Sequence, residues 1–208
     1  FDLSPLVKFL GQFIVAGLMV AAIGPIAALP LPVAGSVSLG AAGYVVAVVW
    51  IGAFVNAFNF MDGLNGMAAG CALAAVLVMA ILNALAGELG LFILCLMMAA
   101  ALLAFFLFNY PGGAIFMGDG GSLAIGCFLA GLAMLSARPD GNGAAVPVIV
   151  LPVMFLPFLL DVTVTLARRI SRGERFYEAH KSHFYQRLNR AGWGHAGVTR
   201  LYLLATLA

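Results

Sequence analysis

The sequence predicts an all-α fold, a polytopic bundle of transmembrane helices that forms one membrane-embedded domain over residues 1–208. Three observations support this prediction: 64% of the residues are hydrophobic, only 9% are charged, and the mean hydropathy is +1.11. Long apolar runs are separated by short breaks of glycine, proline and polar residues, without the alternation of barrel strands. This composition excludes an ordinary globular domain, and no feature of it calls for a nucleic-acid partner.

The apolar runs predict seven spans, because a transmembrane helix needs about 20 apolar residues. They cover roughly residues 7–29, 39–58, 64–86, 89–108, 120–136, 145–167 and a last one from about 197. That last span stops after about half a bilayer, and the opening "FDLSPLVKF" has neither the charged region nor the cleavage site of a signal peptide. We therefore expect the chain to be a fragment of a longer protein.

The basic residues are concentrated near the end of the chain and predict its orientation. Seven of the ten Lys and Arg residues lie between residues 168 and 190. Cytoplasmic loops are enriched in these residues, so we expect residues 168–196 to form a cytoplasmic basic loop. Counting spans back places residues 59–63 and 109–119 on the same face. The outer connections are then the following segments, expected to be bare linkers: 30–38, 87–88 and 137–144.

The first polar segment is "NAFNFMDGLNG", in which polar residues recur at three-residue intervals: Asn56, Asn59, Asp62 and Asn65. Residues three apart are neighbours on a helix, so Asn59 and Asp62 can act as a pair. The steps drift around the helix, so Asn56 and Asn65 cannot share that face. We expect a helix that ends around Asp62, followed by a glycine-containing turn. The alternative is a helix cap and polar turn without further function.

The second polar segment is "FNYPGGAIFMGDGGSLAIG", in which Asp119 lies among glycines just before an apolar span. Backbone N–H groups at the start of a helix favour anions, and glycines let a ligand approach closely. An aspartate at this place suits a Mg²⁺ ion held against phosphate oxygens. The alternative is an ordinary helix start, for which Asp and Ser are common residues.

The third segment is the basic one. Three arginines fall at spacings of four and three residues, namely Arg168, Arg172 and Arg175, and a second set recurs every four residues, namely Phe176, His180, Phe184 and Leu188. This pattern predicts an amphipathic helix that lies in the membrane interface with a cationic side. His180 and His183 within it would suit a diphosphate ligand or proton transfer. The alternative is a solvated loop.

One carboxylate lies within an apolar span. Asp161 is placed in "LPFLLDVTVTLARRI", and a carboxylate inside a span is costly and is a functional hypothesis by default. The alternative is a carboxylate that is satisfied by Thr165 or by an arginine further along the helix. Pro147, Pro152 and Pro157 should bend this span.

These segments, in this order, resemble the polyprenyl-phosphate N-acetylhexosamine-1-phosphate transferases, a group within glycosyl transferase family 4 that includes MraY and the WecA- and WbpL-type enzymes. The matching stretches are "NAFNFMDGLNGMAAG", "FNYPGGAIFMGDGGSLAIG", "LPFLLDVTVTLARRI" and "AHKSHFYQRLNRAGWGHAGVT". The resemblance implies transfer of an N-acetylhexosamine-1-phosphate from a UDP-sugar to undecaprenyl phosphate, with release of UMP. It implies a multi-pass protein of the bacterial inner membrane whose active site faces the cytoplasm, and it allows a homodimer.

The resemblance also implies a role for each matching residue. Mg²⁺, or Mn²⁺ in its place, would be the cofactor, with Asp119 and Asn59 at the metal. The catalytic residues would be Asp62, Asp119, His180 and His183. The substrate-binding residues would be Asn56, Gly63, Leu64, Asn65, Asn109, Phe116, Arg168 and Arg172, of which Gly63, Leu64, Asn65, Asn109 and Phe116 would surround the uracil.

Three departures from the family pattern refine the prediction. Asn65 stands where the common form has an aspartate, which affects the expected nucleotide selectivity. The histidine segment "HKSHFYQRL" lacks a run of adjacent histidines, which favours enzymes that prime O-antigen or related envelope glycans over the peptidoglycan enzymes. The paired aspartates of the family precede the point where this chain begins, so we expect the chain alone to be inactive or nearly so.

Other classes of protein remain as alternatives. A transporter would explain Asp161 and the prolines, but transport sites lie near the midplane and the polar motifs here lie at one interface. A phosphatidyltransferase of the CDP-alcohol type would need paired aspartate motifs that the sequence lacks. A non-catalytic homologue that binds lipid phosphate would share the motifs without turning over substrate.

Overall fold

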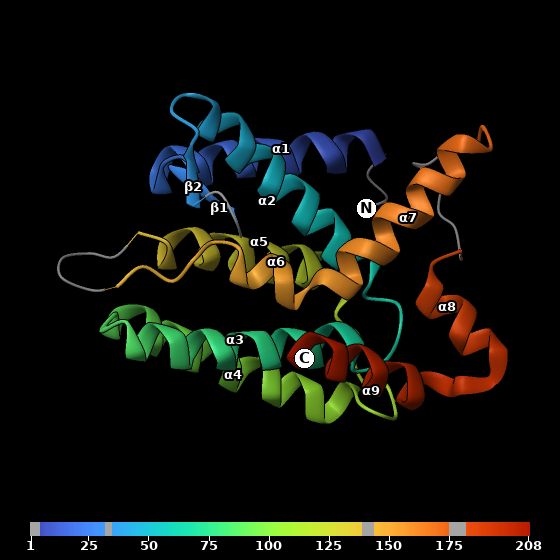
Figure 1. Cartoon of the computed structure of the whole chain (residues 1–208). Helices are drawn as coiled ribbons and strands as arrows, with labels where there is room; N and C mark the ends of the chain where they lie inside the picture. The colour runs from blue at the N-terminus through green and yellow to red at the C-terminus, as the bar shows by residue number, and fades with distance from the viewer. Residues whose placement is uncertain (1–4, 32–34, 139–143, 175–181) are drawn as a thin grey trace.

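The computed structural model describes residues 5–31, 35–138, 144–174 and 182–208, and Figure 1 shows how their helices are arranged. The elements in chain order are α1 (Pro5–Ile23), β1 (Ala28–Leu31), β2 (Gly35–Ser38), α2 (Ala42–Phe60), α3 (Met67–Leu85), α4 (Leu89–Asn109), α5 (Gly118–Ser136), α6 (Val150–Met154), α7 (Leu156–Ser171), α8 (Phe184–Leu188), the π-helical segment η1 (Asn189–Trp193) and α9 (Gly194–Leu207). The prediction of an all-α bundle is confirmed, apart from one short hairpin.

Among the described residues, four helices are long and apolar enough to cross a membrane: α2, α3, α4 and α5. They coincide closely with four of the predicted spans, and they make the chain a multi-pass membrane protein. The predicted total of seven spans is not confirmed. The apolar part of α1 covers only Val7–Ile23, and α9 has 14 residues.

The predicted span over residues 145–167 is interrupted rather than merely bent. Its first residues are not helical, α6 covers Val150–Met154, and α7 begins at Leu156 after a break at Phe155. Proline has no backbone N–H and its ring clashes with the preceding turn, and Pro157 occupies the start of α7. The helix then continues past the predicted end to Ser171.

The connection over residues 30–38 was expected to be a bare linker, and that expectation is wrong for its described part. Strands β1 and β2 pair in an antiparallel hairpin in which Ala28 lies opposite Ser38. Beside the hairpin, the Arg138 guanidinium donates to the backbone oxygens of Ile23, at 2.6 Å, and Pro25. This contact joins the end of α5 to the end of α1 on the side of the bundle away from the polar motifs.

The core lies where α2 meets α5 and α7. Phe54 and Phe58 of α2 pack edge-on against Phe155, with ring centroids 5.2 and 5.9 Å apart, and Phe158 of α7 completes the cluster. Gly126 of α5 lets α5 approach α2 closely, since a Cβ there would lie 3.1 Å from the Cα of Val55. The packed aromatic rings hold the last turns of α2 beside the start of α7.

The ends of the helices divide into two groups in Figure 1. The hairpin and the end of α5 lie toward the left of the view. The start of α1, the turn after α2, the end of α4 and the start of α5 lie toward the right, together with α8 and the start of α9. The polar segments of the sequence are therefore gathered at one end of the bundle, as the count of spans predicts.

Candidate active site

The turn after α2 carries the first polar segment. Helix α2 ends at Phe60, close to the predicted end, and the N–H of Asp62 donates to the Asn59 carbonyl at 3.2 Å. The chain enters α3 through Gly66, whose φ of 78° is disfavoured for other residues. A side chain at Gly66 would also meet the Tyr110 ring, 2.5 Å from its Cδ2. Asp62 thus lies in a short turn between two helices, with its side chain half-buried.

Asp119 lies in the first turn of α5 and faces this turn. The Lys8 ammonium of α1 lies 2.7 Å from its Oδ2, and the Asn59 amide is 3.4 Å from its Oδ1. The same Asn59 amide donates to the Ser122 hydroxyl at 2.7 Å. Asn59 and Asp119, predicted as metal ligands, are thus brought together from α2 and α5.

Asp62 and Asp119 influence each other electrostatically. Burial, and to a smaller extent the negative charge of Asp119, raise the pKa of Asp62 from 3.8 to about 7. An ionised Asp62 therefore needs a compensating positive charge. A carboxyl that titrates near neutrality at such a place is a candidate for proton transfer or for binding a cation.

These residues fit a magnesium ion that is shared with a substrate. Among the described residues no three His, Cys, Asp or Glu side chains are close enough to form a metal site by themselves. Mg²⁺ binds oxygen ligands and usually keeps waters or substrate phosphates alongside one or two carboxylates. The carboxylate of Asp119, with Asn59 and Asp62 nearby, provides such a partial set.

The loop between α4 and α5 is tied to the start of α3 by two asparagines. The Asn109 carboxamide accepts from the N–H of Gly66 at 2.5 Å and donates to the Ile115 carbonyl at 2.7 Å. The Asn65 side chain donates to the Pro111 carbonyl at 3.1 Å. Both asparagines were predicted to be near the uracil, and the structure shows that each also joins two backbone segments.

Phe116 extends from the same loop into solvent, with 77% of its surface exposed. It borders an open groove of about 450 Å³ between α4 and α5, which is lined mainly by apolar side chains that include Leu102 and Phe105. An exposed ring at the edge of a groove suits stacking against a planar ligand.

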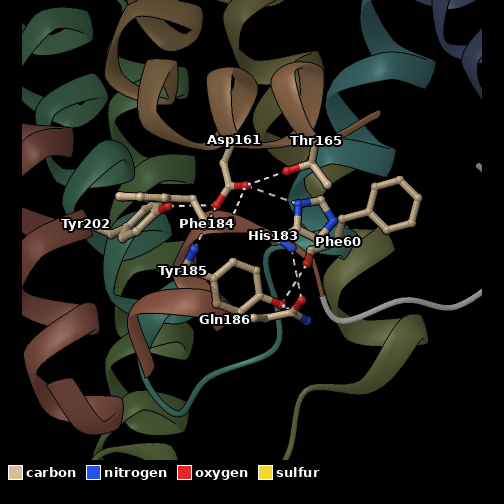
Figure 2. A network of polar contacts seen from close by, with 8 residues as sticks. All are labelled: Phe60, Asp161, Thr165, His183, Phe184, Tyr185, Gln186 and Tyr202. Carbon is tan, nitrogen blue, oxygen red and sulfur yellow. Dashed lines mark hydrogen bonds and ion pairs between the residues drawn. The ribbon is translucent and has the colours of Figure 1, made fainter. Parts of the chain in front are cut away.

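Asp161 of α7 contacts the start of α8, which belongs to the third segment, as Figure 2 shows. Its carboxylate is 1% exposed and accepts from groups on two neighbouring elements. The N–H groups of Phe184 and Tyr185 donate to it at 2.8 and 3.0 Å, and the Tyr202 hydroxyl of α9 does so at 2.8 Å. The imidazole Nδ1 of His183 lies 3.2 Å away, and Thr165 donates at 3.1 Å. The Thr165 contact was anticipated as an alternative to a functional role; the other contacts were not.

His183 is buried, with 2% of its surface exposed. Its ring lies between Phe60 and Tyr185, with centroids 5.9 and 5.8 Å away. Its backbone N–H donates to the Gln186 side chain at 3.2 Å, just before α8 begins. Its predicted catalytic role is untested by this geometry. The predicted partner, His180, lies outside the described residues.

Tyr185 connects this segment to the turn that carries Asp62. Its hydroxyl donates to the Phe60 carbonyl at 3.1 Å and accepts from the Gln186 amide at 3.0 Å. A Cβ built on Gly63 would overlap that hydroxyl and lie 2.9 Å from the ring carbon Cζ. Burial raises the pKa of Tyr185 to about 12, so the phenol stays a hydrogen-bond donor at neutral pH.

The predicted amphipathic helix over the basic segment is not continuous. Helix α7 ends at Ser171, residues 172–174 form a turn in which Glu174 pairs with Arg169 at 3.0 Å, and α8 begins only at Phe184. Gly173 adopts a φ of 69°, which interrupts the helical backbone. Arg168 and Arg172 are exposed at the end of α7.

Two other predicted residues have distinct environments. Asn56 donates to the Gln12 side chain of α1 and, at 2.8 Å, to the Gly52 carbonyl, so its amide joins α1 to α2. Leu64 is buried, with 7% of its surface exposed. Gly63, by contrast, is exposed and leaves the turn accessible beside Asp62.

Several further contacts at the site were missed by the analysis of the sequence. Lys8 was given no role there, and its position at the start of the first apolar span was the available signal. The Thr199 hydroxyl of α9 donates to the Asn65 carbonyl at 2.9 Å, and His195 Nδ1 accepts from the Asn65 N–H at 3.4 Å. Both residues lie in the stretch "AHKSHFYQRLNRAGWGHAGVT" that resembles the family, but nothing in the sequence indicates that they contact Asn65.

Comparison of the sequence with known proteins identifies its family. Residues 1–137 match the family model described as glycosyl transferase family 4. The chain is 31% identical over 208 residues to a probable undecaprenyl-phosphate N-acetylglucosaminyl 1-phosphate transferase of Bacillus subtilis, covering 98% of this chain and 57% of that protein.

Two further relatives show the same partial coverage. A decaprenyl-phosphate N-acetylglucosaminephosphotransferase of Mycobacterium tuberculosis is 30% identical, over 97% of this chain and 55% of that protein. A phospho-N-acetylmuramoyl-pentapeptide-transferase of Lactobacillus delbrueckii is 31% identical, over 86% and 54%. The chain thus spans about half the length of these relatives.

Proposed function

Because the chain belongs to glycosyl transferase family 4, we propose that the protein containing it transfers an N-acetylhexosamine-1-phosphate from a UDP-sugar to undecaprenyl phosphate. An oxygen of the lipid phosphate would form a bond to the phosphorus that carries the sugar, and the bond from that phosphorus to UMP would break. Two of the relatives named above, those of Bacillus subtilis and Mycobacterium tuberculosis, carry a polyprenyl phosphate in their names, which supports the acceptor. The product would prime O-antigen or another envelope glycan.

The observation that carries this proposal is the meeting of Asp62, Asp119 and Lys8 at one end of the bundle. Phosphoryl transfer depends mainly on positioning and on neutralising the charge that develops on phosphate oxygens. A Mg²⁺ ion held by Asp119 and Asn59, with Asp62 nearby, would supply Lewis acidity toward those oxygens. Lys8 supplies a fixed positive charge at the same place.

Asp62 suits proton transfer in this reaction. A catalytic base works best when its pKa lies near the operating pH, and the pKa of Asp62 is about 7. We propose that Asp62 accepts the proton of a singly ionised lipid phosphate, which leaves the attacking oxygen with full negative charge.

The nucleotide would bind where the loop between α4 and α5 meets the turn after α2. Exposed Phe116 offers a face for the uracil, and the Asn65 side chain donates to the Pro111 carbonyl of the same loop. We place this end of the bundle on the cytoplasmic face of the bacterial inner membrane, because the basic residues at the end of α7 lie there and UDP-sugars are cytoplasmic.

The transport alternative loses its main support. Asp161 was its best candidate for a ligand-binding group within the membrane, but its carboxylate is buried and its oxygens already accept from five donors. Such a carboxylate has little capacity left for a transported ion.

The test uses the protein at its natural length, purified in detergent with undecaprenyl phosphate and a panel of UDP-N-acetylhexosamines. We expect Mg²⁺-dependent UMP release with at least one sugar, restored by Mn²⁺ or Mg²⁺ after EDTA. Asp119→Ala should abolish it. Glu88→Gln, which changes an acid between α3 and α4 at the opposite end of the bundle, should release UMP at the wild-type rate. Absence of release with every sugar, from a folded protein, would contradict the proposal.

A further inference from the structure

We propose that Asp161 is a positioning residue that holds the turn carrying Asp62, acting through the start of α8 and the Tyr185 side chain. The inference rests on the proposed function, because the position of Asp62 matters for the rate of the proposed transfer reaction. It concerns a carboxylate that lies outside the set of residues in contact with Asp119 and that takes no direct part in the chemistry described above.

The first step is that Asp161 determines where α8 begins. The first two N–H groups of a helix have no partners within the helix, and here both the Phe184 and the Tyr185 N–H donate to Asp161. The carboxylate also favours the positive end of the helix dipole. Because the Asp161 carboxylate is 1% exposed, these hydrogen bonds form away from bulk water, and leaving their donors unpaired is costly.

The second step is that the orientation of Asp161 is itself determined by neighbours. Thr165, one turn further along α7, donates to Oδ1, and Tyr202 of α9 donates to Oδ2. Both oxygens are needed, since Oδ1 also accepts from the Phe184 N–H and Oδ2 from the Tyr185 N–H. An asparagine at this position would turn an NH₂ group toward donors on one side or the other.

The third step leads from α8 to the catalytic turn. The Tyr185 side chain, placed by the start of α8, is 1% exposed and donates to the Phe60 carbonyl at the end of α2. Gly63 leaves the space that its ring and hydroxyl occupy. Phe60 and Gly63 flank Asp62, so the position of the Asp62 backbone depends on Tyr185, and the position of Tyr185 depends on Asp161.

The test combines kinetics with amide hydrogen exchange on the natural-length protein. The variants are Asp161→Asn, Tyr185→Phe, the double variant, and Thr163→Val as a control that changes an exposed threonine of α7 outside the contacts of Asp161. Exchange is measured on peptides that contain residues 183–188, with peptides from α3 as an internal reference. Thermal unfolding is recorded for each variant.

We expect Asp161→Asn and Tyr185→Phe each to lower kcat by about tenfold or more, since small misplacements of catalytic groups are costly, with KM for the UDP-sugar changed less than about threefold. The double variant should lose no more than the worse single variant, because the two residues act in sequence. The residue 183–188 peptides should exchange faster in Asp161→Asn, and at the wild-type rate in Thr163→Val.

Three results would overturn the inference. They are a wild-type kcat in Tyr185→Phe, unchanged hydrogen exchange in Asp161→Asn, and losses of kcat that are additive in the double variant and proportional to the fraction of unfolded protein. If Asp161→Asn does not fold, Tyr185→Phe still decides, because it removes one oxygen at the far end of the connection. Failure of the proposed function is distinguishable, because the wild-type protein would then release no UMP while hydrogen exchange still reports on the anchoring of α8.

Discussion

The Lys8 ammonium lies 2.7 Å from the Asp119 carboxylate, although the two residues are 111 positions apart in the chain. Both side chains are well exposed, at 40% and 59%. An exposed ion pair of this kind contributes about 0–1 kcal/mol to stability. We therefore expect the ion pair to matter for activity more than for stability, because it places a cation beside the carboxylate that we propose as the metal ligand.

Lys8→Met should lower kcat/KM by about tenfold or more, because a positive charge that stabilises phosphate oxygens is lost. Mg²⁺ should bind more tightly to the variant, since a neighbouring cation no longer repels it. Steady-state UMP release and Mg²⁺ titration measure the two effects. Lys8→Arg, which keeps the charge, is the matched control and should retain more activity; weaker Mg²⁺ binding to Lys8→Met would contradict the assignment.

Gly63→Ala should disturb the contact between the Asp62 turn and Tyr185, because a Cβ at Gly63 overlaps the Tyr185 hydroxyl. We expect a loss of activity and of thermal stability, each partly recovered by adding Tyr185→Phe, which removes the overlapping oxygen. Gly112→Ala is the matched control, since Gly112 is exposed and no atom lies within 4 Å of a Cβ built there. Equal effects of the two alanine variants would refute the steric explanation.

Asp62 should make the protein less stable as the pH rises through the range from about 4 to 7. Its pKa is raised from 3.8 to about 7 in the folded protein, so the folded state holds the proton over a range in which the unfolded state has lost it. Stability is full below this range and lowest above it. In EDTA at pH 8, the free energy of unfolding of Asp62→Asn should therefore exceed that of wild type by on the order of 1–2 kcal/mol after solvent screening. The variant should unfold at a correspondingly higher temperature.

The difference between Asp62→Asn and wild type should shrink as the pH falls toward 4 and disappear well below the unfolded-state pKa of 3.8, where the wild-type carboxyl is protonated in both states. The activity of the wild-type protein should rise with pH through about 7, because the ionised carboxylate is the proposed proton acceptor. A stability difference that is independent of pH would show that Asp62 does not titrate near neutrality.

Asn109→Leu should destabilise the loop between α4 and α5. The side chain is buried and satisfies the Gly66 N–H and the Ile115 carbonyl, so its loss leaves two backbone groups without those partners, at a cost of about 1–3 kcal/mol. We expect lower thermal stability and a higher KM for the UDP-sugar. Asn109→Asp keeps the acceptor for Gly66 but not the donor for Ile115, and an effect as large as that of leucine would assign the cost to the Ile115 contact.

Several features could be predicted from the sequence because they depend on neighbouring residues. The helices α2 to α5 follow from apolar runs of about 20 residues bounded by polar or glycine-rich breaks. The gathering of the polar segments at one end follows from counting those runs. Asn59 and Asp62 were expected at the end of a helix from their spacing and the glycine that follows, and α2 does end there.

The interruption at Phe155 could not be located from the sequence. The prolines indicate bending over a span, but packing of Phe155 between Phe54 and Phe158 decides where the helix breaks. The hairpin of β1 and β2 was missed because each strand has only four residues and the sequence of β1 contains a proline, which argues against a strand. The break within the basic segment falls at Gly173, whose φ of 69° only the structure shows.

A helical membrane protein, its polar end and its family can be predicted from the sequence, because apolar length and motif spacing are local properties of the chain. The contact of Lys8 with Asp119, that of Thr199 with Asn65 and the hydrogen bonds from α8 to Asp161 are seen only in the folded protein. These contacts join residues on different helices. Their formation depends on how side chains pack between those helices, and a residue's neighbours along the chain do not specify that packing.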